Sequence, residues 1–296
     1  MNWKAIARSA IGTSHIKQQM SCQDYGDYRI IDRAIVGVVA DGAGSAKYSD
    51  IGAQLAVNTV LATVTKEDIQ KITKLCGSDR IDRVEKSKSS VLKPLSIFSR
   101  SNKNSDAAVA VVQSDSEHKV KRFFGNIVKQ VTISLKEQAE TNGYEIDDLA
   151  CTLLIAISTP NGIAAMQIGD GFITVRYPER EPELLFAPDK GEYVNETTFV
   201  TSTNALEDMK VVIQAGQPEF VCASTDGLER LAIRLSDWTP FTPFFQPLEQ
   251  YLRETENIES DKYLENFLNS DRLNARTDDD KTLFLCLYES SSHPPQ

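Results

Sequence analysis

The chain has 296 residues, enough to bury a full hydrophobic core in one large domain or two small ones. Hydrophobic residues make up 41% and charged residues 25% of the chain, which is ordinary for a globular protein and excludes a wholly disordered one. The formal net charge of −10 argues against a general nucleic-acid binder, because such a protein needs a basic field. This acid excess is compatible with a solvated surface or with a cluster of carboxylates that holds cations.

The five cysteines are widely spaced and form no CxxC pair, so they indicate neither a zinc knuckle nor a redox dithiol. Their odd number also argues against a disulfide framework. The N-terminus has no apolar stretch long enough for a signal peptide, and no apolar run approaches the ~20 residues that a membrane helix needs. We therefore expect a cytoplasmic protein, monomeric by default, that contacts neither a membrane nor nucleic acid.

Short apolar runs and helical spacings predict the first elements of the chain. Residues 34–40 are apolar and rich in β-branched side chains, which predicts a buried strand that an Asp-Gly pair ends. A helix is expected at about 50–65, and a second helix is expected to end at Asn142-Gly143. The rest of the chain is rich in short strands, which we expect at residues 152–158, 163–168, 172–177, 220–225 and 282–288.

Turn signals separate consecutive strands at residues 160–162 and 169–171. Strands joined by tight turns favour antiparallel sheets over a parallel, doubly wound one. The segment 238–270 carries aromatic residues and leucines and is expected to be helical. We therefore predict an α+β fold in which helices lie outside packed antiparallel sheets.

Residues 66–122 differ in character from the rest of the chain, with 13 Lys and Arg against 8 Asp and Glu. Within them, residues 86–105 are rich in Ser, Lys and Asn, which indicates a mobile surface segment. We interpret 66–122 either as a solvated loop or insertion, or as a docking surface for an acidic partner. The predicted organisation is a single domain over residues 1–289 that contains this insertion, followed by a polar tail at 290–296.

Acidic residues stand at the ends of several predicted strands, in most cases beside a glycine. They are Asp41, Asp170, Asp226 and Asp279. Carboxylates that converge from rigid strand ends are the ligands that hard divalent cations prefer, and an adjacent glycine lets the backbone approach an ion closely. Asp-Gly is also a common turn dipeptide, so the spacing alone leaves metal ligands and ordinary turns as alternatives.

Other chemistries find less support in the sequence. Only three histidines are present and no GxSxG nucleophile elbow appears, so a Ser-His or Cys-His site would depend on His15 alone. The Asp-Gly-Ala-Gly loop before the first helix lacks the third glycine of a dinucleotide-binding loop, because Lys47 occupies its place.

Six short motifs occur in order along the chain, and all but the first lie at a predicted strand boundary. They are Cys22-Gln23-Asp24, VVADGAGS at 38–45, Ala150-Cys151-Thr152, IGDG at 168–171, ASTDGL at 223–228 and DDKTL at 279–283. Together they resemble the motifs of the metal-dependent protein phosphatases of the PPM type (type 2C). The resemblance implies two packed antiparallel sheets flanked by helix pairs, and a protein serine/threonine phosphatase that acts on phosphoprotein substrates.

The resemblance also implies two Mg2+ or Mn2+ ions at one end of the sandwich. Asp41 would bridge both ions, the Gly42 carbonyl would bind one of them, and Asp226 and Asp279 would bind the other. A hydroxide that bridges two such cations attacks the phosphorus of a phosphoserine or phosphothreonine ester in line, so Asp41, Asp226 and Asp279 are the expected catalytic residues.

Further residues take secondary roles in this interpretation. Asp24 would act through metal-bound water, and Asp170 would help Asp226 to hold a third, weaker ion. The terminal motif leaves open whether Asp279 or its neighbour Asp280 is the ligand.

Two features of the family are absent from this sequence. No Arg lies between Arg8 and Asp24, where family members carry the Arg that grips the substrate phosphate, so His15 and Lys17 are the candidates to replace it. The His of the usual Asp-Gly-His motif is also absent. Two alternatives therefore stay open: a catalytically weak or inactive member of the fold that binds a phosphoprotein or another partner, and a phosphatase for a small phosphomonoester.

Overall fold

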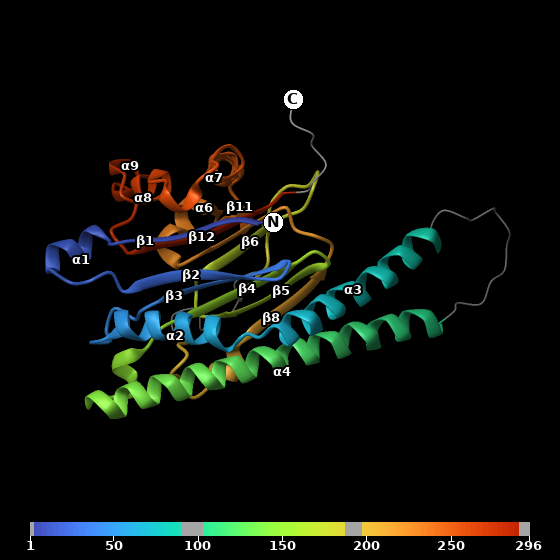
Figure 1. Cartoon of the computed structure of the whole chain (residues 1–296), viewed down its shortest axis with the longest axis horizontal. Helices are drawn as coiled ribbons and strands as arrows, with labels where there is room; N and C mark the ends of the chain where they lie inside the picture. The colour runs from blue at the N-terminus through green and yellow to red at the C-terminus, as the bar shows by residue number, and fades with distance from the viewer. Residues whose placement is uncertain (1–2, 90–102, 187–196, 290–296) are drawn as a thin grey trace.

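Two five-stranded antiparallel sheets face each other in the computed structural model (Figure 1). The structure describes residues 3–89, 103–186 and 197–289, without the side chains of 78–89, 103–114 and 259. The first sheet contains, in spatial order, β1 (Trp3–Ala10), β12 (Lys281–Tyr288), β9 (Phe220–Ser224), β6 (Phe172–Arg176) and β7 (Glu183–Leu184). The second contains β2 (Asp24–Ile31), β3 (Ala34–Asp41), β4 (Leu153–Thr159), β5 (Gly162–Ile168) and β8 (Lys210–Ala215).

Helices cover the outer face of each sheet, as Figure 1 shows. The second sheet is covered by α2 (Ser49–Thr63), α3 (Lys66–Ser89) and α4 (Lys103–Asn142). The first is covered by α6 (Glu229–Ala232), α7 (Thr242–Glu254), η3 (Ile258–Ser260), α8 (Tyr263–Leu268) and α9 (Asp271–Asn274). The connections contain α1 (Thr13–Gln18), η1 (Ile146–Leu149), α5 (Ala205–Asp208), η2 (Asp226–Leu228) and the short pair β10 (Ile233–Arg234) and β11 (Thr239–Pro240).

The central strands are apolar throughout because both of their faces are buried. In β3, Ile35 and Val39 point into the core between the two sheets. Val36 and Val38 alternate with them and pack against the helices on the outer face. This two-sided burial is why β3 reads in the sequence as a continuous run rather than as an alternation of apolar and polar residues.

The predicted fold class is confirmed, but three of the longer strands and the two-residue strands β7, β10 and β11 were not predicted from the sequence. β1, β2 and β8 are missing from the prediction, and all three are edge strands of their sheets. Most residues of β2 and β8 are only partly buried, so these strands lack the continuous apolar run that marked the central ones.

The interpretation of residues 66–122 as a solvated loop is wrong where the structure describes them. Residues 66–89 form α3 and residues 103–122 belong to α4, while 90–102 lie outside the described residues. Ile69, Ile72 and Val120 bury their side chains against the second sheet. The polar tail at 290–296 also lies outside the described residues. None of the described helices is long and apolar enough to cross a membrane.

A contact between the sheets makes a first testable prediction. A Cβ atom added at Gly37 would lie 2.0 Å from Cε1 of the fully buried Phe284, so the second sheet can approach the first only with glycine here. We expect Gly37→Ala to lower the free energy of unfolding by about 1–3 kcal/mol, measured by urea denaturation. Phe284→Leu should offset part of that loss in the double variant. Gly125→Ala on α4 is the control, because its added Cβ would have no atom closer than 3.9 Å; equal unfolding energies for both glycine variants would contradict the contact.

Candidate metal centre

Acidic residues from distant parts of the sequence meet at one end of the sandwich. Asp41 is the last residue of β3, and antiparallel pairing puts it opposite Asp24, the first residue of β2. Asp226 lies just after β9, and Asp279 lies just before its antiparallel partner β12. Because antiparallel neighbours place the end of one strand beside the start of the next, both sheets bring carboxylates to the same end.

Asp170 reaches this end by a different route. We expected residues 169–171 to form a hairpin turn, but β5 and β6 belong to different sheets, so the turn carries the chain from one sheet to the other. Gly169 has a φ of +101°, a backbone conformation that suits glycine. The crossing leaves Asp170 between the two sheets, on the same side as the other carboxylates.

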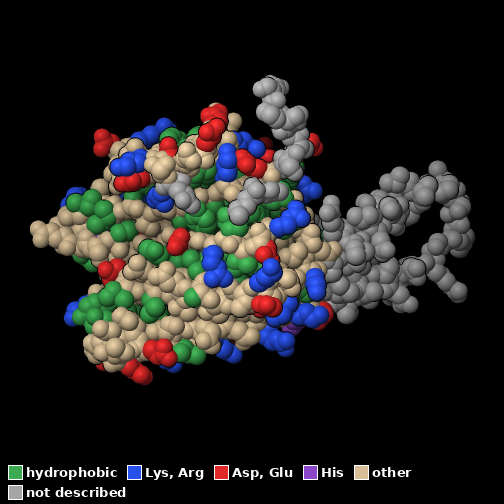
Figure 2. Space-filling model, viewed as in Figure 1, with side chains coloured by type: hydrophobic (Ala, Val, Ile, Leu, Met, Phe, Trp, Pro, Cys, Tyr) green, Lys and Arg blue, Asp and Glu red, His purple; other side chains and the backbone are tan. Residues whose placement is uncertain are grey.

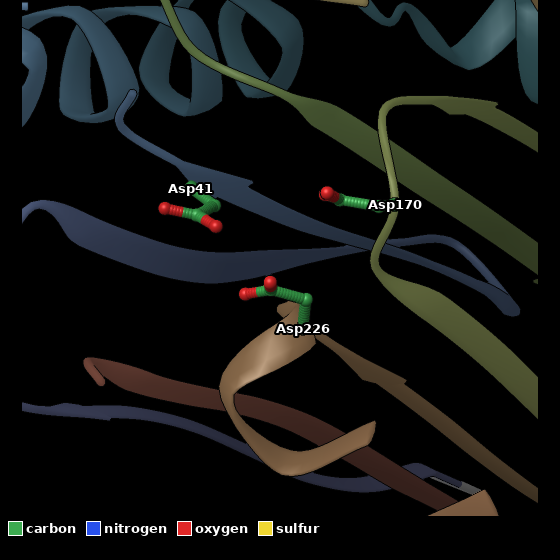
Figure 3. A group of neighbouring side chains, drawn as sticks. All are labelled: Asp41, Asp170 and Asp226. Carbon is green, nitrogen blue, oxygen red and sulfur yellow. The ribbon is translucent and has the colours of Figure 1, made fainter. Parts of the chain in front are cut away.

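Three of these carboxylates converge on one point. Asp41, Asp170 and Asp226 each offer one oxygen atom, and the three oxygens lie within 4.8 Å of one another. Figure 3 shows the side chains pointing toward one another from three separate segments. Oxygens at this spacing can share one cation, and carboxylate oxygens are the donors that Mg2+ and Mn2+ prefer.

The backbone of Asp41 is fixed by Thr152, which lies just before β4. The Asp41 N–H donates to Thr152 Oγ1 at 2.9 Å, and the Thr152 N–H donates to the Asp41 carbonyl at 2.7 Å. A Cβ at Gly169 would lie 2.5 Å from Thr152 Cγ2, so Thr152 also contacts the turn that carries Asp170. The Ala150-Cys151-Thr152 motif therefore holds two of the carboxylates in position without contributing a charge.

Hydrogen bonds distinguish the two candidate residues before β12. Asp280 is buried, and its carboxylate accepts from the Gly12 N–H at 2.6 Å and from the Gln23 N–H at 2.5 Å. These bonds tie the N-terminal segment to β12. Asp279 instead lines the cavity that contains the converging carboxylates.

The cavity has a volume of about 220 Å³. Besides the carboxylates, its walls include Gly42, Gln23 and two residues that the sequence analysis did not identify, Thr197 and Phe199. The hydroxyl of Thr197 donates to Asp170 at 2.6 Å. Neither residue lies in a strand or in a predicted motif, and no local pattern in the sequence could have indicated them.

One basic side chain lines this cavity among the described residues, and it is His15. Its Nδ1 lies 2.9 Å from Oδ2 of Asp280, so the imidazole lies directly beside a carboxylate that the backbone already holds. Lys17, the other candidate for phosphate contact, is exposed on α1 and does not line the cavity.

In the absence of a cation, burial makes ionisation of these carboxylates unfavourable. Burial is the main cause that raises the pKa of Asp24 to about 8, a rise that the hydrogen bond from the Thr225 hydroxyl reduces. Burial also raises the pKa of Asp226 to about 6, and the charges of Asp170 and Asp279 add to the rise. The pKa of Asp41 lies well above its usual range, through burial first and then through the charge of Asp24.

These donors fit divalent cations. They are carboxylates that crowd one another, and the pKa values of Asp41 and Asp226 rise because burial and the charges of neighbouring carboxylates disfavour the charged forms. A bound cation would reverse that balance, because it supplies opposite charge directly beside the crowded carboxylates. The set contains no thiolate and no imidazole within the triad, which is typical of Mg2+ or Mn2+ rather than of zinc.

Comparison with known proteins identifies the family. A family model described as protein phosphatase 2C matches residues 11–269. Serine/threonine-protein phosphatase 3 of Escherichia coli (strain K12) is 32% identical to this chain over 296 residues, which cover 97% of this chain and 99% of that protein.

Solved structures agree at the level of the fold. A bacterial serine phosphatase superposes with a TM-score of 0.54 at 12% identity, covering 98% of this chain and 99% of the other. The phosphatase Stp1 of Staphylococcus aureus gives 0.54 at 13%, covering 98% and 96%. The catalytic domain of the phosphatase PstP, in complex with two manganese ions, gives 0.52 at 13%, covering 98% and 99%. The motifs, the sandwich and these matches agree, and the chain belongs to the protein phosphatase 2C family.

Proposed function

We propose that this chain is a metal-dependent protein phosphatase that hydrolyses phosphoserine and phosphothreonine monoesters in phosphoproteins. The observation that carries the proposal is the convergence of Asp41, Asp170 and Asp226 on one point of an open cavity. The related Escherichia coli protein is named as a serine/threonine phosphatase, and this supports the substrate class. An inactive binding module would gain nothing from crowded carboxylates that repel one another without a cation.

In this proposal, two Mg2+ or Mn2+ ions occupy the cavity. Asp41, Asp226, Asp279 and the carbonyl of Gly42 would hold them, with Asp24 acting through water from behind Asp41. Asp170 would contribute to a third, weaker site. When bound, such cations lower the pKa of a water molecule toward neutrality and neutralise charge on the phosphoryl oxygens.

The remaining residues act by positioning. Thr152 fixes the Asp41 backbone, and Thr225 donates a 2.6 Å hydrogen bond to Asp24, so both hold the carboxylates where a cation needs them. His15 is the candidate that contacts the substrate phosphate in place of the family arginine. Its pairing with Asp280 would orient the ring toward the cavity.

Other aspects of the biology are also proposals. A cytoplasmic location is supported by five cysteines that are all free thiols, as expected in a reducing compartment. We also propose a monomer, and a partner surface within residues 66–122.

Metal-dependent hydrolysis tests the main proposal. We expect the protein to hydrolyse a phosphoserine peptide with Mn2+ and to lose this activity in EDTA. Asp41→Asn and Asp226→Asn should each lower kcat/KM by about 10³-fold or more, because each removes a charged ligand from the centre. The control is Asp237→Asn, an exposed residue of the β10–β11 pair that bonds Thr239. The absence of metal-dependent hydrolysis by the unmodified protein, on both a phosphopeptide and para-nitrophenyl phosphate, would overturn the proposal.

The neighbours Asp279 and Asp280 form a matched pair of variants. We expect Asp279→Asn to raise the Mn2+ concentration for half-maximal activity by about tenfold without lowering the stability of the metal-free protein. Asp280→Asn should lower the free energy of unfolding of the metal-free protein by about 2–3 kcal/mol, because the Gly12 and Gln23 N–H groups bind different oxygens of Asp280 and asparagine replaces one of them with an NH2 donor. Urea denaturation in EDTA and Mn2+ titrations of activity separate the two effects. The reverse pattern would assign the ligand to Asp280.

The raised carboxylate pKa values predict how metal binding stabilises the fold at different pH. A carboxylate whose folded pKa lies above its unfolded value stabilises the fold below about pH 4 and loses that contribution as pH rises through the folded value. With Asp226 near 6 and Asp24 near 8, the metal-free protein therefore loses stability between about pH 4 and pH 8. We expect the increase in Tm caused by saturating Mg2+ to be larger at pH 8 than at pH 5.5, by at least about 3 °C. Asp226→Asn should reduce this difference, and an increase in Tm that is independent of pH would contradict the assignment.

A further inference from the structure

A second hollow of about 580 Å³ lies on the outer face of the molecule, away from the carboxylates. One wall is formed by α4 and the other by the segment that contains α5. We call it the basic groove, and its main lining residues are Lys121, Arg122, Asn126, Lys129, Leu206 and Met209. Its α4 wall falls within the basic stretch 66–122 and just beyond it.

Three of the four Lys and Arg side chains that line this groove have no ion pair among the described residues. Lys121, Arg122 and Lys129 are exposed, and the structure gives them no ion pair among the described residues. The one carboxylate in the lining, Asp115, pairs with Lys119 at 2.5 Å. Figure 2 shows Lys and Arg side chains gathered over this part of α4, beside the grey atoms. A chain with a net charge of −10 therefore has three unpaired cations close together in this groove.

The opposite wall is apolar. The side chain of Leu206 is 37% exposed, and Met209 lies buried beside it. Gly125 of α4 faces both, since a Cβ there would lie 3.9 Å from Leu206 Cδ2 and from Met209 Cε. Glycine inside a helix costs about 1 kcal/mol relative to alanine, and here it keeps the space between the walls open. The groove thus combines cations on one side with an exposed leucine on the other.

A short segment joins the groove to the cavity of the metal centre. Phe199 lines that cavity, and Leu206 follows it by seven residues, a distance of at most about 25 Å for an extended chain. The segment is fixed at both ends, because the Val200 N–H donates to the Cys151 carbonyl at 2.8 Å and the Thr198 hydroxyl donates to Asp208 at 2.7 Å. One peptide chain can therefore reach both places at once.

We propose that the basic groove binds an acidic, leucine-containing segment of the phosphoprotein substrate while the phosphorylated residue occupies the cavity. This inference rests on the proposed phosphatase function and adds a basis for substrate choice. Asp and Glu side chains would pair with Arg122 and Lys129, and an apolar side chain would lie against Leu206. The groove would also offset the repulsion that an acidic substrate meets from a protein of net negative charge.

The test uses phosphoserine peptides that differ only in their docking segment. One set carries glutamates and leucines about ten residues before or after the phosphoserine, and a matched set carries glutamines for the glutamates. We expect a KM for a glutamate peptide at least about fivefold below that of its glutamine match, with similar kcat, and a smaller difference in 0.5 M NaCl. Equal KM values for every glutamate and glutamine pair would overturn the proposal.

Charge reversals locate the effect. Arg122→Glu with Lys129→Glu should raise the KM for the glutamate peptide to that of the glutamine peptide. The control, Arg33→Glu with Lys262→Glu, makes the same change in net charge at two other exposed positions and should keep the preference. A preference that survives in the groove variant, or that disappears equally in the control, would overturn the assignment to the groove.

Two further measurements distinguish an absence of phosphatase activity from an absence of substrate binding in the groove. Hydrolysis of para-nitrophenyl phosphate by the unmodified protein tests only the former. Binding of a fluorescein-labelled, unphosphorylated glutamate–leucine peptide, measured by anisotropy in EDTA, tests the groove without catalysis. Weaker binding by the groove variant than by the control variant supports the proposal, and equal binding contradicts it.

Discussion

Repulsion between carboxylates that are held close together is the constraint on which the functional end of this molecule depends. Asp41, Asp170 and Asp226 bring oxygen atoms within 4.8 Å of one another, and burial raises the pKa of Asp226 and of its neighbour Asp24. Such a cluster of like charges does not stabilise the fold in the absence of a cation. The two-sheet core and the helices outside it must therefore hold the carboxylates in place against an unfavourable local free energy, which a bound cation relieves.

The residues that hold the carboxylates in place are either uncharged or already hydrogen-bonded to the backbone. Thr152 makes two hydrogen bonds to the backbone of Asp41, and Thr225 donates to the side chain of Asp24. The carboxylate of Asp280 accepts hydrogen bonds from the N–H groups of Gly12 and Gln23. The two threonines fix their neighbours without adding a negative charge to the centre, whereas the charge of Asp280 still raises the pKa of Asp24 and of Asp279.

Elements with a clear local pattern could be predicted from the sequence. Features that depend on tertiary contacts could not. β3 was predictable because burial on both faces makes it apolar throughout, whereas the edge strands β1, β2 and β8 lack that signal. The order of the Asp-Gly motifs indicated the carboxylates. The motif order could not distinguish Asp279 from Asp280 as the ligand, because the two neighbours differ only in the direction that the backbone gives to each side chain. Phe199 lines the cavity from an irregular connection, and no periodic pattern in the sequence predicts the path of that connection.

The net charge of −10 has opposite effects on the two ligands of the proposed reaction. It attracts divalent cations to the carboxylates, but it repels a phosphoprotein, above all an acidic one. Bound cations reverse the sign only at the cavity, over a distance that salt limits to about 8–10 Å. The rest of an acidic substrate would still face a negative surface. Lys121, Arg122 and Lys129 are exposed cations without ion pairs among the described residues, and they lie within reach of the same peptide chain. These cations line a hollow separate from the cavity of the carboxylates, so selection among phosphorylated chains can occur in the groove without altering the metal centre.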